Sequence, residues 1–215
     1  MSKLAMVFNG PPGCGKGTVI KLLSGYGLSF RILPMSGLLL KLKDSPVCGA
    51  EVREAMDSGN LVPDGITLGA FFEAWNDLEK HGSTHLMLDG VVRTELQATE
   101  IAWMIRLHGH YYQPMQIVLE VSEDECQRRL SLRQRGKDDR LEVVAKRFQV
   151  YKEKTLMAIE RFASAFPGCT LRTSNDRDPS LTASEIKIEL EKRFGSLLSP
   201  SELHAKRAKK MGFSD

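Results

Sequence analysis

Long hydrophobic runs and cysteine motifs are both missing from this sequence. No apolar stretch approaches the roughly 20 residues that a membrane-spanning helix needs. No secretory signal is evident, because the short apolar run Leu4–Phe8 meets glycines and prolines at once. The four cysteines lie far apart and form no C-x-x-C pair, which argues against a zinc site or a disulfide scaffold. We therefore expect a cytoplasmic protein with reduced thiols.

A strong excess of charge is also lacking. The 215 residues carry 30 basic and 27 acidic side chains, for a net charge of +3. So small an excess does not indicate a nucleic-acid-binding protein. The five histidines form no metal-ligand pattern. The chain is long enough for one sizeable core, and we expect a monomer that contacts neither nucleic acid nor a membrane.

Short apolar runs alternate with amphipathic segments along the chain. The runs typical of buried strands are 4–8, 84–88, 116–121 and 169–173, with a weaker candidate at 29–33. Between them, the apolar spacing predicts a helix from Asp64 to about Lys80 and a longer helix over 141–165. Continuous apolar strands suit a parallel sheet covered on both faces, so we predict a doubly wound α/β fold with a five-stranded parallel sheet.

A glycine-rich segment, Gly10–Thr18, follows the first predicted strand and has the G-x-x-x-x-G-K spacing of a phosphate-binding loop, or P-loop. Glycines let several backbone N–H groups face one anion, and the following helix directs its positive end to the same point. Lys16 can contact the β- and γ-phosphates, and the Thr18 hydroxyl can contact Mg²⁺. The residues expected to bind ATP phosphates are Gly13, Cys14, Gly15, Lys16, Gly17 and Thr18.

The loop alone does not separate a kinase from a GTPase or an ATPase, although the guanine-recognition sequence N-K-x-D is absent. Further segments follow: Ser36-Gly37, Gly59-x-Leu61-Val62-Pro63-Asp64, Asp89-Gly90-x-x-Arg93 with Gln97, and Arg129-x-x-x-Arg133 before Asp138-Asp139. Together with the loop, over roughly residues 4–194, the chain resembles adenylate kinases and related nucleoside monophosphate kinases of the short-lid type. The resemblance implies a P-loop NTPase-type fold, ATP as phosphoryl donor and Mg²⁺ as cofactor.

An acceptor site is expected beside the loop. Asp89 ends a predicted strand at the carboxyl edge of the sheet, where it can support Mg²⁺ through water. Arg93 can hold an acceptor phosphate with its planar fork. Gln97 offers both a donor and an acceptor to a base, and by resemblance it recognises the adenine of AMP. The resemblance implies an AMP site of Ser36, Lys41, Asn60, Leu61, Val62, Gly90, Arg93, Gln97 and Arg147.

Arginines in the second half of the chain are spaced to share helix faces. Arg129 and Arg133 lie on one predicted helix, and Arg140 and Arg147 on the next. Positive groups around a transferring phosphoryl group supply much of the rate of such reactions, although a salt-bridged helix surface is the alternative. By resemblance, Arg129 stacks on the ATP adenine and Arg133 also binds ATP. The predicted catalytic residues are Lys16, Arg93, Arg133, Arg147, Asp138 and Asp139, the two acids orienting guanidinium groups.

The resemblance also divides the chain. It implies a kinase core over 1–34 and 65–195, an acceptor-binding arm over 35–64 and a short lid over 134–139. A basic tail, 196–215, is expected to be solvated, with contact to a polyanion as the alternative. Arg177, after the last strand, is a candidate for the neighbourhood of the adenine.

Several positions depart from the family pattern. Leu38 stands where the family usually has Asp, Lys41 replaces an Arg, Val91-Val92 replaces an aromatic-Pro pair, and Gly136 replaces a lid Arg. We predict transfer of the ATP γ-phosphoryl group to AMP, giving two ADP. The departures leave two alternatives open, namely another acceptor such as UMP or CMP, and a degenerate module that binds nucleotides without turnover.

Overall fold

The computed structural model describes residues 3–26, 30–80, 85–109, 112–133 and 140–195. Its centre is a five-stranded sheet of order β2-β3-β1-β4-β5, in which every pair is parallel. The strands are β1 (Lys3–Asn9), β2 (Phe30–Pro34), β3 (His85–Asp89), β4 (Tyr112–Glu120) and β5 (Thr170–Ser174). The predicted α/β fold and all five predicted strands are confirmed.

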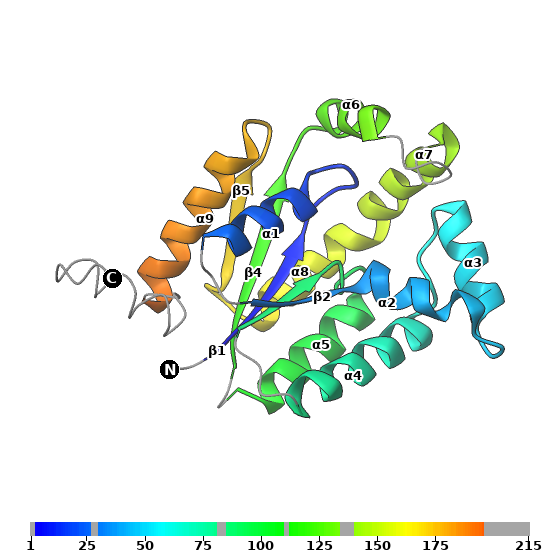
Figure 1. Ribbon diagram of the computed structural model, residues 1–215, viewed down its shortest axis with the longest axis horizontal. Helices are drawn as coiled ribbons and strands as arrows, with labels where there is room; N and C mark the ends of the chain where they lie inside the picture. Colours follow the sequence, from blue (N-terminus) through cyan, green and yellow to red (C-terminus); the bar gives the residue numbers. More distant parts are fainter. Residues whose placement is uncertain (1–2, 27–29, 81–84, 110–111, 134–139, 196–215) are drawn as a thin grey trace, which may run out of the picture.

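Helices cover both faces of the sheet (Figure 1). One face packs against α1 (Lys16–Gly25) and α9 (Pro179–Phe194). The other packs against α4 (Asp64–Lys80), α5 (Glu95–Leu107) and α8 (Leu156–Ala165). The remaining elements lie toward the carboxyl edge: α2 (Met35–Lys41), the 3₁₀ turn η1 (Leu42–Asp44), α3 (Gly49–Ser58), α6 (Glu123–Arg133) and α7 (Leu141–Val150).

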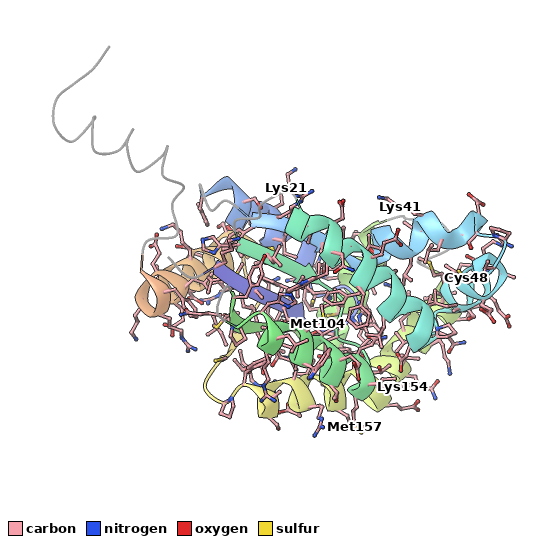
Figure 2. The ribbon with its side chains drawn as sticks, turned by 90° about the horizontal axis from the view of Figure 1, so that it is seen from below. Lys21, Lys41, Cys48, Met104, Lys154 and Met157 are labelled. Carbon is pink, nitrogen blue, oxygen red and sulfur yellow. The ribbon has the colours of Figure 1, made fainter. Side chains whose placement is uncertain are left out.

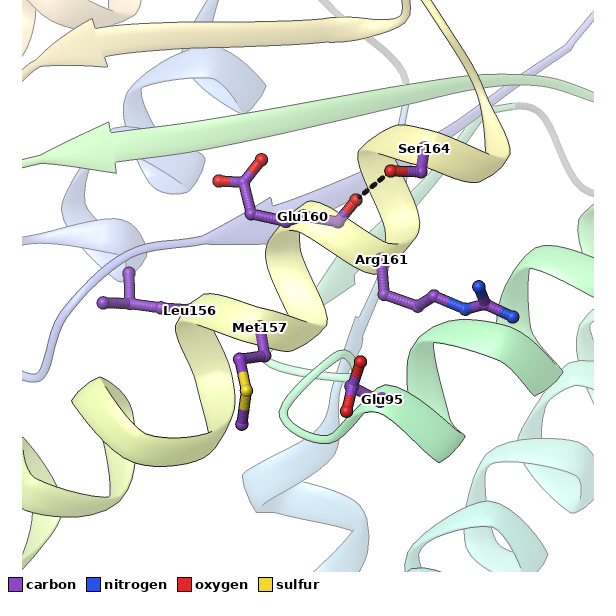
Figure 3. Close-up of a pocket in the computed structure, with 6 residues that line it drawn as sticks. All are labelled: Glu95, Leu156, Met157, Glu160, Arg161 and Ser164. Carbon is purple, nitrogen blue, oxygen red and sulfur yellow. Dashed lines mark hydrogen bonds between the residues drawn. The ribbon is translucent and has the colours of Figure 1, made fainter.

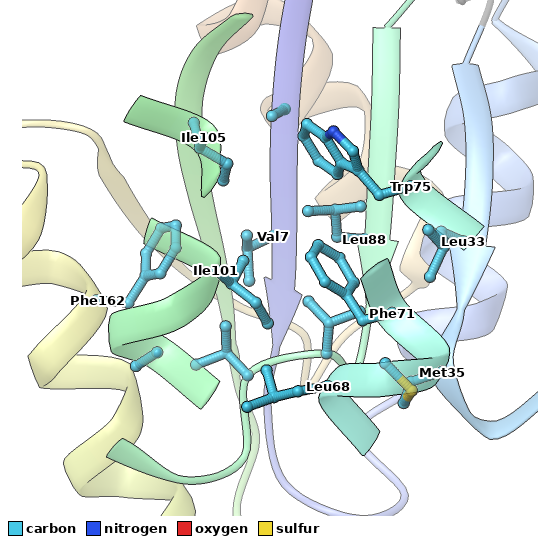
Figure 4. Packing of buried hydrophobic residues seen from close by; sticks show 14 of the residues in the cluster. Val7, Leu33, Met35, Leu68, Phe71, Trp75, Leu88, Ile101, Ile105 and Phe162 are labelled. Carbon is cyan, nitrogen blue, oxygen red and sulfur yellow. The ribbon is translucent and has the colours of Figure 1, made fainter. Parts of the chain in front are cut away.

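The central strand β1 is buried on both sides. Ala5 and Val7 belong to the apolar cluster under α4, α5 and α8, called here the α4-side cluster. Leu4, Met6 and Phe8 belong to the α1-side cluster, under α1 and α9. This alternation explains why the strand reads as one continuous apolar run. Figure 4 shows the α4-side cluster, where Phe71, Trp75, Ile101 and Phe162 meet Val7 and Leu88 of the sheet.

The predicted long helix over 141–165 is interrupted. Between α7 and α8 lies a π-helical turn, η3 (Tyr151–Thr155), in which the Leu156 N–H donates to the Tyr151 carbonyl five residues earlier. Apolar spacing predicts the helix but does not reveal the wider turn, because the residues on either side keep their periodicity. The helix predicted from Asp64 has the expected bounds.

None of the helices within the described ranges is long and apolar enough to cross a membrane. All four cysteines are free thiols.

The pH dependence of stability should depend on His85. The Leu4 N–H donates to His85 Nδ1 at 2.9 Å, so this nitrogen must be unprotonated. Burial, assisted by the charge of Lys3, lowers the pKa of His85 below 6.5. Since the unfolded chain binds the proton more readily, this contribution is complete above that value and is lost as the pH falls below it.

We expect the urea concentration at the unfolding midpoint to decrease as the pH is lowered from about 7.5 to about 5.5. His85 should contribute at most about 1.4 kcal/mol per pH unit to the change in the free energy of unfolding. His85→Asn should flatten this slope, because an amide oxygen can accept the same hydrogen bond without titrating. Identical slopes for the two proteins would contradict the assignment.

Candidate active site

The phosphate loop and the segment after β3 begin side by side. Phe8 pairs with Asp89 across β1 and β3, and the Gly90 N–H donates to the Phe8 carbonyl at 3.4 Å. Parallel strands end at the same edge of the sheet, so the loop after Asn9 leaves β1 next to the Asp89 carboxylate. This edge therefore carries both the predicted anion-binding loop and the predicted metal-supporting acid.

The P-loop curls directly into α1. Gly15 is the N-cap residue, with a φ of 87° that favours glycine, and its carbonyl accepts from the N–H groups of Thr18 and Val19 at 3.0 and 3.1 Å. The Lys16 ammonium lies across the loop, where it donates to the Gly10 carbonyl at 3.1 Å and lies 3.5 Å from Cys14 Sγ. The strand–loop–helix context expected of a phosphate site is present.

Arg129 of α6 binds the loop from outside. Its Nε donates to Glu125 at 2.7 Å, Nη1 to the Cys14 carbonyl at 3.3 Å and Nη2 to the Asn175 carbonyl at 2.6 Å. All these bonds lie near the plane of the guanidinium group, so a flat face remains for stacking on a base. The stacking role that the resemblance implies for Arg129 is compatible with this arrangement and stays a prediction.

Two residues of this network were missed by the sequence reasoning. Hydrogen bonds from Arg128 and then Arg129 lower the pKa of the Glu125 carboxyl to about 2, so Glu125 is ionised at neutral pH. Its i,i+4 spacing to Arg129 is a signal that could have identified it. Asn175 donates from Nδ2 to the Cys14 carbonyl at 2.7 Å, although the two residues are 161 positions apart in the sequence. No local sequence pattern predicts this hydrogen bond.

Cys126 of α6 packs beneath the loop. A Cβ on Gly13 would lie 2.6 Å from the Cys126 carbonyl, which shows how closely α6 approaches the loop. Burial, with a smaller contribution from the neighbouring Cys14, raises the pKa of the Cys126 thiol to about 12. The thiol is therefore protonated at neutral pH and serves in packing, not as a nucleophile.

On the acceptor side, Gln97 is held at both ends of its amide. Nε2 donates to Asp64 Oδ1 at 2.8 Å, and Oε1 accepts from the Arg93 N–H at 2.9 Å. Thr94 also donates to Asp64 Oδ1, at 2.9 Å. With 1% of its surface exposed, Gln97 is buried here, and its two bonds fix which way the amide faces.

The Arg93 side chain lies beside Gly90. A Cβ on Gly90 would be 3.2 Å from Arg93 Nη2, which places the guanidinium group next to the end of β3. The Arg93 carbonyl accepts from Thr155 of the π-helical turn at 3.3 Å. Tyr151 of the same turn is half-buried, and chiefly for that reason its pKa is raised to about 12. The turn therefore braces the segment that carries Arg93.

The segment predicted as the acceptor arm lies against α7. A Cβ on Gly59 would meet the Val143 carbonyl at 2.7 Å and Arg147 Cγ at 3.2 Å. Arg147 thus lies against the arm, and its predicted acceptor role stays a prediction. Arg140 of the same segment donates from Nη2 to the Asp57 carbonyl at the end of α3, at 3.2 Å. Its expected place near the transferring phosphoryl group stays a prediction.

Other predicted positions are distributed along the arm and beyond it. Ser36 and Lys41 are exposed on α2, and Figure 2 shows Lys41 and Cys48 at the same end of the molecule.

The predicted positions after α3 differ in burial. Leu61 is half-buried, Val62 is buried, and Asn60 donates to Ser58 at 3.0 Å. Arg177 donates to Glu185 of α9, and its place near the adenine stays a prediction. The Arg133 side chain, Asp138 and Asp139 lie outside the described residues.

The donor set fits a magnesium ion that arrives with a nucleotide. Within the described ranges, no group of three or more His, Cys, Asp or Glu side chains could hold a metal ion by itself. Asp89 lies at the sheet edge and the Thr18 hydroxyl lies on the exposed first turn of α1. One carboxylate and one hydroxyl suit Mg²⁺, which takes its remaining ligands from phosphates and water.

A separate hollow of about 430 Å³ lies on the outer side of α8, at the start of α5 (Figure 3). Its walls include Glu95, Leu156, Met157 and Arg161. None of the residues predicted to bind ATP or AMP lines it. Chemistry at the P-loop therefore does not use this hollow.

Comparison with known proteins agrees with the geometry. A sequence model of the family described as adenylate kinase matches residues 8–166. The chain belongs to the adenylate kinase family. The adenylate kinase of Gemmatimonas aurantiaca is 34% identical over 182 residues, which cover 71% of this chain and 83% of that protein. The adenylate kinase of Prochlorococcus marinus is 35% identical over 87% of this chain and 97% of that protein.

This membership confirms the resemblance drawn from the sequence segments. It also confirms the class of enzyme, a nucleoside monophosphate kinase, and the P-loop fold on which adenylate kinases are built.

The contact between the arm and α7 can be tested with a matched pair of glycines. Gly59 and Gly168 both have a φ of 77°, but nothing lies within 4 Å of a Cβ on Gly168. Each alanine variant should lose about 1–2 kcal/mol of stability through backbone strain. Gly59→Ala should also push the arm from α7 and raise the KM for the nucleoside monophosphate several-fold, whereas Gly168→Ala should not. Equal KM values in steady-state assays would show that this contact does not affect the acceptor.

Proposed function

We propose that this member of the adenylate kinase family catalyses reversible transfer of the γ-phosphoryl group of ATP to AMP, giving two ADP. The observation that carries the proposal is the meeting, at one sheet edge, of two segments that are predicted to bind anions. The P-loop leaves β1 beside Asp89, and Arg93 follows on the next turn of chain. The relatives named adenylate kinase support the choice of AMP.

The donor would bind at the P-loop. Backbone N–H groups and the positive end of α1 would hold the ATP phosphates, with Gly13, Cys14, Gly15 and Gly17 forming the cradle. Lys16 would exchange its bond to the Gly10 carbonyl for the phosphates. Thr18 and Asp89 would hold Mg²⁺, which neutralises phosphate charge when bound. Arg129 would stack on the adenine.

The acceptor would bind between α5 and the arm. Arg93 and Arg147 would hold the AMP phosphate, and Gln97 would offer its remaining N–H and lone pair to the base. Because Gln97 is buried, the arm must move aside to admit the base and then close over it. Further contacts are proposed from Ser36, Lys41, Asn60, Leu61, Val62 and Gly90.

Catalysis would depend on positive charge and orientation. An AMP phosphate is already anionic near neutral pH, so the reaction needs no strong general base. We propose that Lys16, Arg93, Arg133 and Arg147 stabilise the transferring group, with Asp138 and Asp139 orienting guanidinium groups. Closure of the arm (35–64) and the lid (134–139) over the core would exclude water and limit hydrolysis. A monomer in the cytoplasm is the proposed state, in keeping with free thiols.

A coupled assay of ADP formation tests the proposal directly. The purified protein should convert ATP and AMP to ADP, with lower kcat/KM for UMP, CMP and GMP. Lys16→Ala should reduce kcat by about 100-fold or more, because it removes a charge that faces the transferring group. Lys21→Ala, on the exposed side of α1 (Figure 2), is the control and should retain activity. ATP binding without ADP formation from any acceptor would refute the enzyme and leave a nucleotide-binding module.

Acceptor choice should depend on the reach of residue 97. Gln97→Asn shortens the side chain by one methylene, so the amide can no longer span Asp64 and the Arg93 N–H. We expect kcat/KM for AMP to fall about tenfold, as for the loss of one or two good hydrogen bonds, with a smaller loss for CMP and UMP. Gln113→Asn, an exposed change at the opposite end of β4, is the control. An unchanged AMP to CMP ratio would remove Gln97 from base recognition.

A further inference from the structure

Asn175, directly after β5, has a buried polar side chain that makes one hydrogen bond. It is 0% exposed, and its Nδ2 donates to the Cys14 carbonyl at 2.7 Å. Its Oδ1 has no hydrogen-bond partner among the described residues. A buried acceptor without a partner destabilises the fold, and an apolar side chain of the same size would avoid that loss. The donation to the P-loop is therefore what the asparagine contributes.

The orientation of one peptide group shows why that donation matters. In a trans peptide, the carbonyl and the following N–H point in opposite directions. With the Cys14 carbonyl held toward Asn175, the Gly15 N–H points away from the packed side of the loop. None of the hydrogen bonds recorded within the described ranges uses this N–H. It is thus left to meet an anion.

Close packing at Gly15 makes the geometry specific. A Cβ there would lie 2.9 Å from Asn175 Nδ2 and 3.5 Å from Arg129 Nη1, so only glycine lets both donors reach the carbonyl before it. Arg129 contributes a longer bond, 3.3 Å, to the same carbonyl, and it also holds the Asn175 backbone carbonyl at 2.6 Å. Asn175 makes the shorter bond, and its side chain is wholly shielded from solvent.

We propose that Asn175 is a positioning residue for the donor nucleotide. It fixes the Cys14–Gly15 peptide so that the Gly15 N–H is aimed at an ATP phosphate oxygen before ATP arrives. Asn175 itself touches no substrate. The inference rests on the proposed function, because it takes the P-loop as the ATP site.

The test separates donor from acceptor binding. Asn175→Leu keeps the number of side-chain heavy atoms but removes the donor, and Asn175→Ala removes the donor without adding bulk. Each variant should raise the KM and the calorimetric Kd for Mg·ATP about tenfold, the effect expected for one charge-assisted hydrogen bond. The KM for AMP should stay within twofold, which also reports that the variants are folded. Asn76→Ala, an exposed asparagine on α4, should change neither constant.

The melting temperature distinguishes positioning from support of the fold. Since Asn175→Leu removes an unpaired buried acceptor, it should melt at or above the temperature of the parent protein. A role in stability alone would lower the melting temperature and raise both KM values together, and this outcome would overturn the proposal, as would ATP constants within twofold of the parent. If the parent protein forms no ADP, the proposed function fails, yet the ATP calorimetry of parent and variants still decides the role of Asn175.

Discussion

The parallel register of β1 with its neighbours is the constraint on which the site depends. Phe8 opposite Asp89 brings the end of β1 to the end of β3, and the loops that follow must emerge together. A shift of one residue would turn the Asp89 side chain to the other face of the sheet. The alternating burial of β1 between two clusters resists such a shift, because it would exchange the residues that each cluster accepts.

Around this edge, hydrogen bonds within the protein hold the Arg129 guanidinium group and the backbone of Arg93. Arg129 bonds to Glu125 and to two backbone carbonyls, and the backbone of Arg93 is bonded on both sides, by Gln97 and Thr155. Groups fixed in this way need little reorganisation when a phosphate arrives, which is how enzymes gain most from electrostatic stabilisation. The ionised Glu125 also keeps the local field from being wholly positive.

Much of this could be predicted from the sequence, and the reasons for the exceptions are physical. Strands such as β1 can be predicted from their continuous apolar runs. The P-loop can be predicted from glycines spaced so that several backbone N–H groups face one anion. Glu125 was within reach of a helical spacing argument. The pairs Cys14–Asn175 and Asp64–Gln97 join residues 161 and 33 positions apart, and only the folded chain brings them together. The bond from Arg140 to the arm was missed because helical spacing gives a face but not the neighbour opposite it.

The π-helical turn between α7 and α8 changes the direction in which the side chains that follow it point around the helix axis. An α-helix rotates about 100° per residue, so one residue added in a wider turn rotates everything beyond it by that angle. On one side of the turn, Phe148 enters the α1-side cluster, and on the other, Phe162 enters the α4-side cluster. The length of η3 is therefore constrained more tightly than its composition. Deleting a single residue there would rotate Phe162 relative to Arg147 about the helix axis, so that both could no longer face their present neighbours. This would hold even if every remaining side chain in the turn were acceptable.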